Sequence, residues 1–110
     1  IQPSLSYSGE GVVTPAQTEQ PLINSATCYI VPNNTTELYL NITNRDAREV
    51  TIYRDNTSIG IIPGGSTRTL SYGTYNLPGV WSASITAQAS GASRSNIETK
   101  SGNIIFCQPI

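Results

Sequence analysis

The chain has 110 residues, a formal net charge of −1 and no histidine, which is the size of one small domain. Apolar residues make up 37% and charged residues only 12%, so we expect a folded chain whose surface is covered mainly by hydroxyl and amide groups. The six basic residues are scattered and form no run, which argues against DNA or RNA as a partner.

Several classes of function are excluded by the residue types present. Without histidine, neither a Ser-His-Asp nor a Cys-His catalytic group can form. Two cysteines cannot make a four-cysteine zinc site, and we expect no metal and no cofactor. The spacing of the seven acidic residues selects no carboxylate pair for glycoside hydrolysis, so we do not expect an enzyme. The apolar runs are far shorter than the roughly 20 residues of a membrane helix, so we expect no membrane span.

The first element in the chain is an alternating segment, residues 1–13. One face of it is mostly apolar and the other is polar, as in an extended strand. The mostly apolar face carries Ile1, Pro3, Leu5, Tyr7, Gly9, Gly11 and Val13. A linker with two prolines, residues 14–21, follows it and separates it from the domain of residues 22–110. The segment starts at Ile1 without a basic or a long apolar stretch, and we expect a mature N-terminus.

Two hypotheses for residues 1–13 stay open. The segment is either the first strand of its own domain or a donor strand that completes the sheet of a neighbouring subunit. Gly9 and Gly11 favour the donor strand, because glycine weakens a private strand but suits close contact with another backbone. A head-to-tail contact of this kind does not close on itself, so identical subunits would build a filament.

The domain itself shows period-2 patterns and no convincing helix. The predicted strands, in chain order, are residues 26–31, 37–43, 48–54, 58–62, 67–72, 81–89 and 103–108. Residues 73–79 and 91–95 contain glycine-rich turns, and we expect the last strand to be covered on both faces. Short strands at this spacing predict an all-β fold, an antiparallel β-sandwich of about seven strands.

Two cysteines lie at apolar positions of predicted strands, one early and one late in the chain. We expect a disulfide between Cys28 and Cys107, which would stabilise the fold by about 4 kcal/mol because the closed loop is long. Two reduced cysteines in the core are the alternative. A disulfide agrees with an oxidising, extracellular location.

Four asparagines begin N-glycosylation sequons, and all four lie between residues 33 and 58. They are Asn33, Asn34, Asn41 and Asn56. We expect N-linked glycans on them, although an Asn- and Thr-rich chain also accumulates such triplets by composition. Asn41 is predicted on the outward face of a strand and Asn56 in a turn, where a glycan has room.

A monomeric binding module is the alternative to a filament. Tyr29, Tyr39 and Tyr53 are predicted on outward strand faces, and exposed aromatic rings can build a flat platform for sugars in a secreted carbohydrate-binding or adhesin-type domain. Outward tyrosines can equally pack across neighbouring strands.

Four segments resemble the immunoglobulin-like heads of archaeal surface-filament proteins. They are residues 38–44 (LYLNITN), 50–53 (VTIY), 62–67 (IPGGST) and 77–86 (LPGVWSASIT). Archaeal pilins and archaellins carry such heads behind a long apolar helix, which this chain does not show, and the chain is more similar to the subunits of archaeal threads. The resemblance implies a glycosylated immunoglobulin-like domain at the cell surface, joined head to tail by donor strands and serving adhesion or biofilm formation. On this resemblance the donor segment is residues 1–13.

Overall fold

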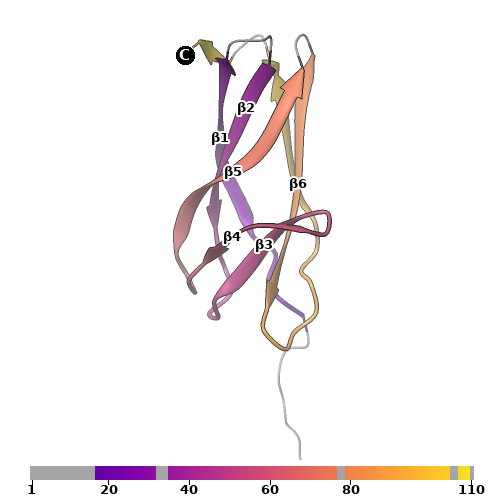
Figure 1. Ribbon diagram of the computed structural model, residues 1–110. Coiled ribbons are helices and arrows are strands. Elements are labelled where there is room, and N and C mark those ends of the chain that lie inside the picture. Colours follow the sequence, from indigo (N-terminus) through magenta and orange to yellow (C-terminus); the bar gives the residue numbers. More distant parts are fainter. Residues whose placement is uncertain (1–16, 32–34, 77–78, 105–106, 110) are drawn as a thin grey trace, which may run out of the picture.

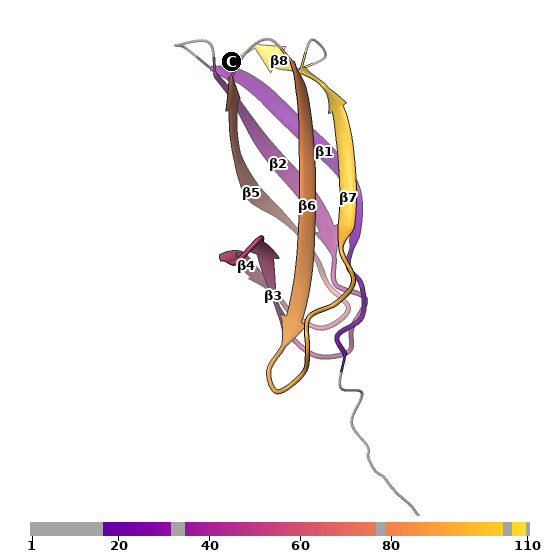
Figure 2. The same cartoon turned by 90° about the vertical axis from the view of Figure 1, so that its right-hand side faces the viewer.

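The computed structural model describes residues 17–31, 35–76, 79–104 and 107–109, which form a sandwich of two sheets (Figures 1 and 2). The strands are β1 (Leu22–Val31), β2 (Thr35–Thr43), β3 (Val50–Arg54), β4 (Thr57–Ile62), β5 (Thr67–Asn76), β6 (Val80–Ala89), β7 (Glu98–Asn103) and β8 (Gln108–Pro109). The described residues contain no helix long and apolar enough to cross a membrane.

One sheet has the strand order β5-β2-β1-β8 and the other has β4-β3-β6-β7. All pairs of neighbouring strands are antiparallel except β1 and the two-residue β8, which are parallel at Tyr29 and Ile30. Seven strands therefore make up the two antiparallel sheets, and the predicted β-sandwich is confirmed.

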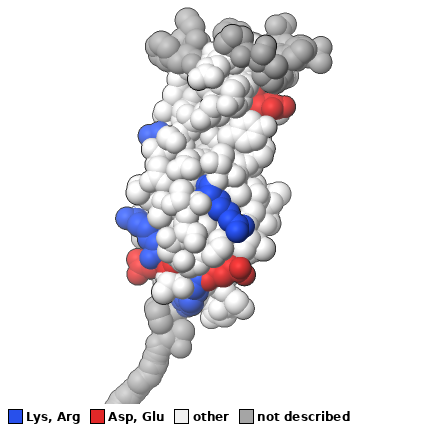
Figure 3. Space-filling view, turned by 90° about the vertical axis from the view of Figure 1, so that its left-hand side faces the viewer, with Lys and Arg blue, Asp and Glu red and all other residues white. Residues whose placement is uncertain are grey.

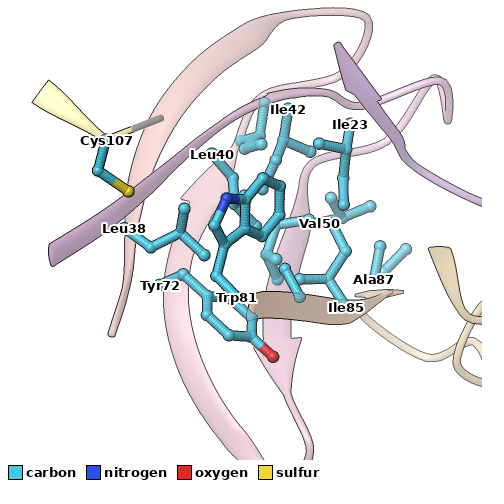
Figure 4. Packing of buried hydrophobic residues seen from close by; sticks show 14 of the residues in the cluster. Ile23, Leu38, Leu40, Ile42, Val50, Tyr72, Trp81, Ile85, Ala87 and Cys107 are labelled. Atoms are coloured by element: carbon cyan, nitrogen blue, oxygen red, sulfur yellow. The ribbon is translucent and has the colours of Figure 1, made fainter. Parts of the chain in front are cut away.

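The core lies between the sheets and is built from alternating side chains, as predicted. In β2 the residues Leu38, Leu40 and Ile42 are fully buried, and in β6 every second residue from Trp81 to Ala89 is buried. Figure 4 shows the indole ring of Trp81 among these aliphatic side chains, beside Tyr72 of β5. The polar residues between them face outward, because successive side chains of a strand point to opposite faces.

The predicted disulfide is confirmed. Cys28 in β1 and Cys107, directly before β8, are bonded to each other with their Cα atoms 4.8 Å apart. The bond fastens the C-terminal end of the described chain to the first strand, at the end of the sandwich opposite residues 17–21 (Figures 1 and 2).

The strand predicted at residues 103–108 is wrong. The chain forms β7 earlier, at Glu98–Asn103, and Ile104 is buried at a turn before Cys107. The pattern missed β7 because its sequence, ETKSGN, contains no large apolar residue. Its inward position opposite Trp81 is Gly102, so the ring of Trp81 fills the space that a side chain of β7 would otherwise take.

The predicted turn at residues 73–79 also begins too early. Strand β5 continues through Gly73 to Asn76, and the pairing with β2 shifts by one residue at this point, between Leu38 and Tyr39. Gly73 has φ +156° and a Cβ there would stand 2.1 Å from Arg54 Nη1. The glycine therefore marks a β-bulge inside a strand and not the end of one.

Candidate functional site

The chain enters the domain through a short segment, residues 17–21, that is tied down at one end of the sandwich. Thr18 is 3% exposed, and its hydroxyl donates to the carbonyl of Ser93 at 2.8 Å and accepts from the backbone N–H of Ala89 at 2.9 Å. The backbone N–H of Glu19 donates to Asp46 Oδ2 at 3.0 Å. These residues form the second half of the predicted linker, residues 14–21, and their position against the domain is fixed.

Asp46 is the centre of the polar network at this end. It is 4% exposed and accepts hydrogen bonds from the backbone N–H, Nε and Nη2 of Arg48 at 2.8–2.9 Å. The hydrogen bonds from the Arg48 side chain hold the pKa of Asp46 well below its usual range, and the backbone N–H groups of Glu19 and Arg48 add to this. Figure 3 shows that most charged side chains of this face gather near this end.

One edge of the sandwich is only partly paired. On the side away from β2, strand β1 pairs with β8 only at Tyr29 and Ile30. We call the remaining stretch on that side, Leu22–Cys28, the β1 edge. Among the described residues, one side chain bonds to its backbone: the N–H of Ile23 donates to Glu98 Oε2 at 3.0 Å. Unpaired backbone groups along such an edge are available to another strand.

The inward face of β1 is also less well covered than the rest of the core. Ala26, Cys28 and Ile30 pack against the core but remain only partly buried, whereas their neighbours Leu38 and Leu40 in β2 are 0% exposed. A half-covered apolar row, beside backbone groups that pair with no strand of the described chain, is a surface that an added strand can complete, because it offers hydrogen bonds and side-chain contacts together.

The edge of β6 is closed by two tyrosines of β5. Strand β3 pairs with β6 only from Tyr53 to Val50, so none of the described strands lies beside the backbone of β6 around Ser82 and Ser84 on that side. The Tyr72 hydroxyl donates to the carbonyl of Ser84 at 3.3 Å and accepts from its N–H at 3.1 Å. The Tyr75 hydroxyl donates to the carbonyl of Ser82. These side chains replace part of the missing ladder.

Two arginines make similar contacts to the other strands facing this gap. Arg54 Nη1 donates to the carbonyl of Tyr72 in β5 at 2.7 Å, and Arg68 Nη1 donates to the carbonyl of Ile61 in β4 at 3.3 Å. The side of the sandwich between β5 and β6 is thus protected by polar side chains. At the β1 edge, by contrast, Glu98 bonds to one end of the strand, and the inward apolar side chains farther along the strand are only half-covered.

No pattern in the sequence points to Glu98, Ala26, Tyr72 or Tyr75 as functional residues. Only a knowledge of which strands are neighbours gives these residues a role, since none of them stands in a recognisable motif. Tyr72 and Tyr75 are three residues apart, and only the bulge at Gly73 places both hydroxyls on the β6 side.

The predicted donor residues, Ile1 to Val13, and the sequons at Asn33 and Asn34 lie outside the described residues. The other two sequons lie in different surroundings. Asn41 is partly buried in the outer face of β2, where its Nδ2 donates to Thr69 Oγ1 at 3.2 Å and its Oδ1 accepts from Asn24 Nδ2 at 3.0 Å. Asn56 is exposed at the tip of the β3–β4 hairpin.

The three outward tyrosines do not form one platform. Tyr29 and Tyr39 meet edge to face on one sheet, with ring centroids 6.0 Å apart. Tyr53 belongs to the other sheet, and its ring is covered by the Arg94 guanidinium at 4.0 Å. The hydrogen bond from Tyr39 to Glu37 raises the pKa of Tyr39. This arrangement favours the alternative that the outward tyrosines pack across neighbouring strands.

Within the described residues, no group of three or more His, Cys, Asp or Glu side chains lies close enough together to hold a metal ion. Comparisons with protein-family profiles, with curated proteins and with solved structures gave no match.

Proposed function

We propose that the protein is a structural subunit of an extracellular filament of the kind formed by archaeal threads, and that residues 1–13 of one subunit add a strand to the β1 edge of the next. The observation that carries this proposal is the β1 edge itself. It combines backbone groups without a strand partner among the described residues with the half-covered apolar side chains of Ala26 and Cys28.

The positions of the chain ends support a head-to-tail contact. Residues 17–21 lie at one end of the sandwich, and β8 with its disulfide lies at the other (Figure 2). The donor segment is thus attached at the end of the domain that lies farthest from the disulfide, and a subunit placed beyond that end is within its reach. Neighbouring subunits would then repeat along one direction.

The lengths of the two segments also agree. The seven residues of the β1 edge extend over about 23 Å at roughly 3.3 Å per residue, and the 13 residues of the donor segment extend over about 43 Å. The donor can cover the whole edge and leave several residues to bridge two subunits. If residues 1–7 lie on the edge, burial of Ile1, Leu5 and Tyr7 at about 1.5 kcal/mol or more each supplies about 4.5 kcal/mol, before the entropy cost of ordering the segment is subtracted.

The proposal is tested with two pairs of matched variants in the full chain. Leu5→Asp places a charge on the inward face of the donor, and Ser6→Asp places the same charge on the outward face. Ala26→Asp places a charge under the β1 edge, and Ser25→Asp places it on the exposed neighbour. We expect Leu5→Asp and Ala26→Asp to abolish filaments in electron micrographs, and the two serine variants to keep them.

A mixing experiment identifies the two partners. The Leu5→Asp chain keeps an intact β1 edge, and the Ala26→Asp chain keeps an intact donor. Mixing the two should give a defined dimer by light scattering, since each chain supplies the half that the other lacks. A native protein that stays monomeric at every concentration contradicts the proposal, and so does a mixture of the two folded variants that stays monomeric.

A further inference from the structure

A pocket of about 310 Å³ lies on the outer face of the second sheet, next to the tip of the β3–β4 hairpin. It is bounded by Asp55 and Asn56 of the hairpin, by Ser84 and Thr86 of β6, and by Arg94 and Ile97 of the segment before β7. Its volume is at the lower end of the range of small-ligand sites, about 300–1,000 Å³. It has room for a ligand of modest size, such as one or two sugar units.

The lining combines hydrogen-bonding groups with one apolar side chain. Ser84 and Thr86 supply hydroxyls, and the Thr86 Oγ1 is buried without a hydrogen-bond partner among the described residues. Ile97 is 62% exposed, although it is a large aliphatic residue. A neutral sugar has hydroxyls around its ring and an apolar face of C–H groups, so it can satisfy both kinds of surface.

The Arg94 side chain, which forms one wall of the pocket, makes two contacts with the hairpin. Its guanidinium is stacked on Tyr53 at 4.0 Å, and Nη1 donates to the carbonyl of Asp55 at 2.5 Å. These contacts tie the segment before β7 to the base of the hairpin tip. The position of Asn56 relative to Ile97 is therefore set by side chains on both sides of the pocket.

Asn56 is itself the acceptor of the sequon Asn56-Thr57-Ser58. It is exposed in a two-residue turn whose first residue, Asp55, has φ 55°, and its amide makes no hydrogen bond within the described residues. Asn41, by contrast, would have to give up or rearrange its bond to Thr69 within the outer face of a sheet. A modifying enzyme therefore reaches Asn56 more easily than Asn41.

We propose that Asn56 is the glycosylated asparagine of the described domain and that the first sugar units of its glycan occupy this pocket. Because the glycan is attached to Asn56 at the rim of the pocket, its effective concentration there is in the millimolar range. Weak contacts are therefore sufficient to hold its first sugar units in the pocket. The seated glycan packs against Ile97 and hydrogen-bonds the walls. The proposal requires only that the protein is secreted through a pathway that attaches N-glycans. It applies equally to a monomer and to a filament subunit.

The test uses the full chain secreted from a host that attaches N-glycans. Glycopeptide mass spectrometry should show Asn56 occupied at least tenfold more than Asn41. Amide hydrogen exchange at residues 94–97 should be several-fold slower in the glycosylated protein than after enzymatic removal of the glycan. Ile97→Asp should abolish this difference, and Ile61→Asp, at an exposed isoleucine outside the pocket, should keep it.

Three results would overturn the proposal. The first is an Asn56 that carries no glycan. The second is an occupied Asn56 whose glycan leaves exchange at residues 94–97 unchanged. The third is protection of residues 94–97 in the Asn56→Gln protein by an added free oligosaccharide, with none from the attached glycan, which would assign the pocket to a saccharide from solution.

Discussion

Gly102 of β7 lies directly opposite Trp81 of β6, and a Cβ on residue 102 would stand 2.6 Å from Trp81 Cζ2. The absence of a side chain at this position lets the indole ring lie under the backbone of the neighbouring strand. The core at this edge of the sandwich is thus completed by one ring from β6 and not by residues of β7.

The first prediction concerns this contact. Gly102→Ala should lower the free energy of unfolding by about 1–3 kcal/mol, because the ring or the strand must move to admit the methyl group. The exposed neighbour offers a control: Ser101→Ala should change stability by no more than about 0.5 kcal/mol. Urea unfolding followed by the fluorescence of Trp81, the sole tryptophan, measures both. Equal stability of the two variants would show that the contact is not tight.

The disulfide gives the second prediction. Replacing both Cys28 and Cys107 by serine should lower the free energy of unfolding by about 4 kcal/mol, since the bond closes a loop with a sequence separation of 79 residues. The unsubstituted chain, unfolded in urea and reduced, should refold with a urea midpoint lowered by the same amount. Matching urea midpoints for the native and the double-variant chains would contradict this expectation.

Acid should weaken the anchor of residues 17–21. The pKa of Asp46 is lower in the folded chain than in the unfolded chain, where an aspartate titrates near pH 3.9. Its contribution to stability is therefore complete above about pH 5 and is lost as the pH falls below that value. Asp46→Asn should cost about 2 kcal/mol at pH 7, because hydrogen bonds to a charged acceptor are lost.

The pH dependence supplies its own check. The difference in unfolding free energy between Asp46→Asn and the native chain should shrink between pH 5 and pH 2. Glu49→Gln, a change at an exposed acid nearby, is the matched control for the removal of one negative charge. A difference for Asp46→Asn that is the same at pH 7 and pH 2 would mean that its charge contributes nothing.

The fourth prediction concerns the tyrosines that cover β6. Tyr72→Phe leaves the N–H and carbonyl of Ser84 without this partner and should cost about 1–3 kcal/mol. The opened edge should also raise the rate of aggregation in light-scattering measurements. Tyr29→Phe removes a hydroxyl from the outer face of β1, in the same sheet as Tyr72, and is the control. A Tyr72→Phe chain as stable and as soluble as Tyr29→Phe would show that the hydroxyl does not protect the edge.

The tyrosine hydroxyls also predict a response to alkali. Burial raises the pKa of Tyr75 in the folded chain, so its contribution to stability is full below the unfolded value of about 10 and falls as the pH rises above it. The native chain should therefore lose stability above pH 10 more steeply than Tyr75→Phe. Parallel curves for the two chains would contradict this.

Alternation of side chains was enough to predict the strands whose inward faces are aliphatic. The patterns around Leu40, Ile52 and Ile85 each lie within a strand of the structure, because one face of each is buried against the other sheet. Strand β7 carries no such pattern, since its inward contact is made by a ring from another strand. Gly73 predicts a turn, because glycine is common in turns, and nothing in the local sequence distinguishes a turn from a bulge.

The candidate site was harder to predict for a different reason. An open edge is a property of which strands are neighbours and how far each pairing extends, and β1 is exposed because β8 covers only Tyr29 and Ile30. The length of that pairing cannot be obtained from the pattern of either strand. The disulfide was accessible from the sequence because only two cysteines are present and both occupy apolar positions.

The fixed entry of the chain at residues 17–21 has a mechanical consequence. Strand β1 follows this segment directly and runs along the long direction of the sandwich (Figure 2), so tension on the N-terminal side of Gln17 acts along the strand axis. The pairing of β1 with β2 extends from Leu22 to Val31, and a force in this direction loads its hydrogen bonds together in shear. Within this paired stretch, the covalent bond from Cys28 to Cys107 also stops the strand from sliding past β8. The domain is thus built to resist stretching from its N-terminal side.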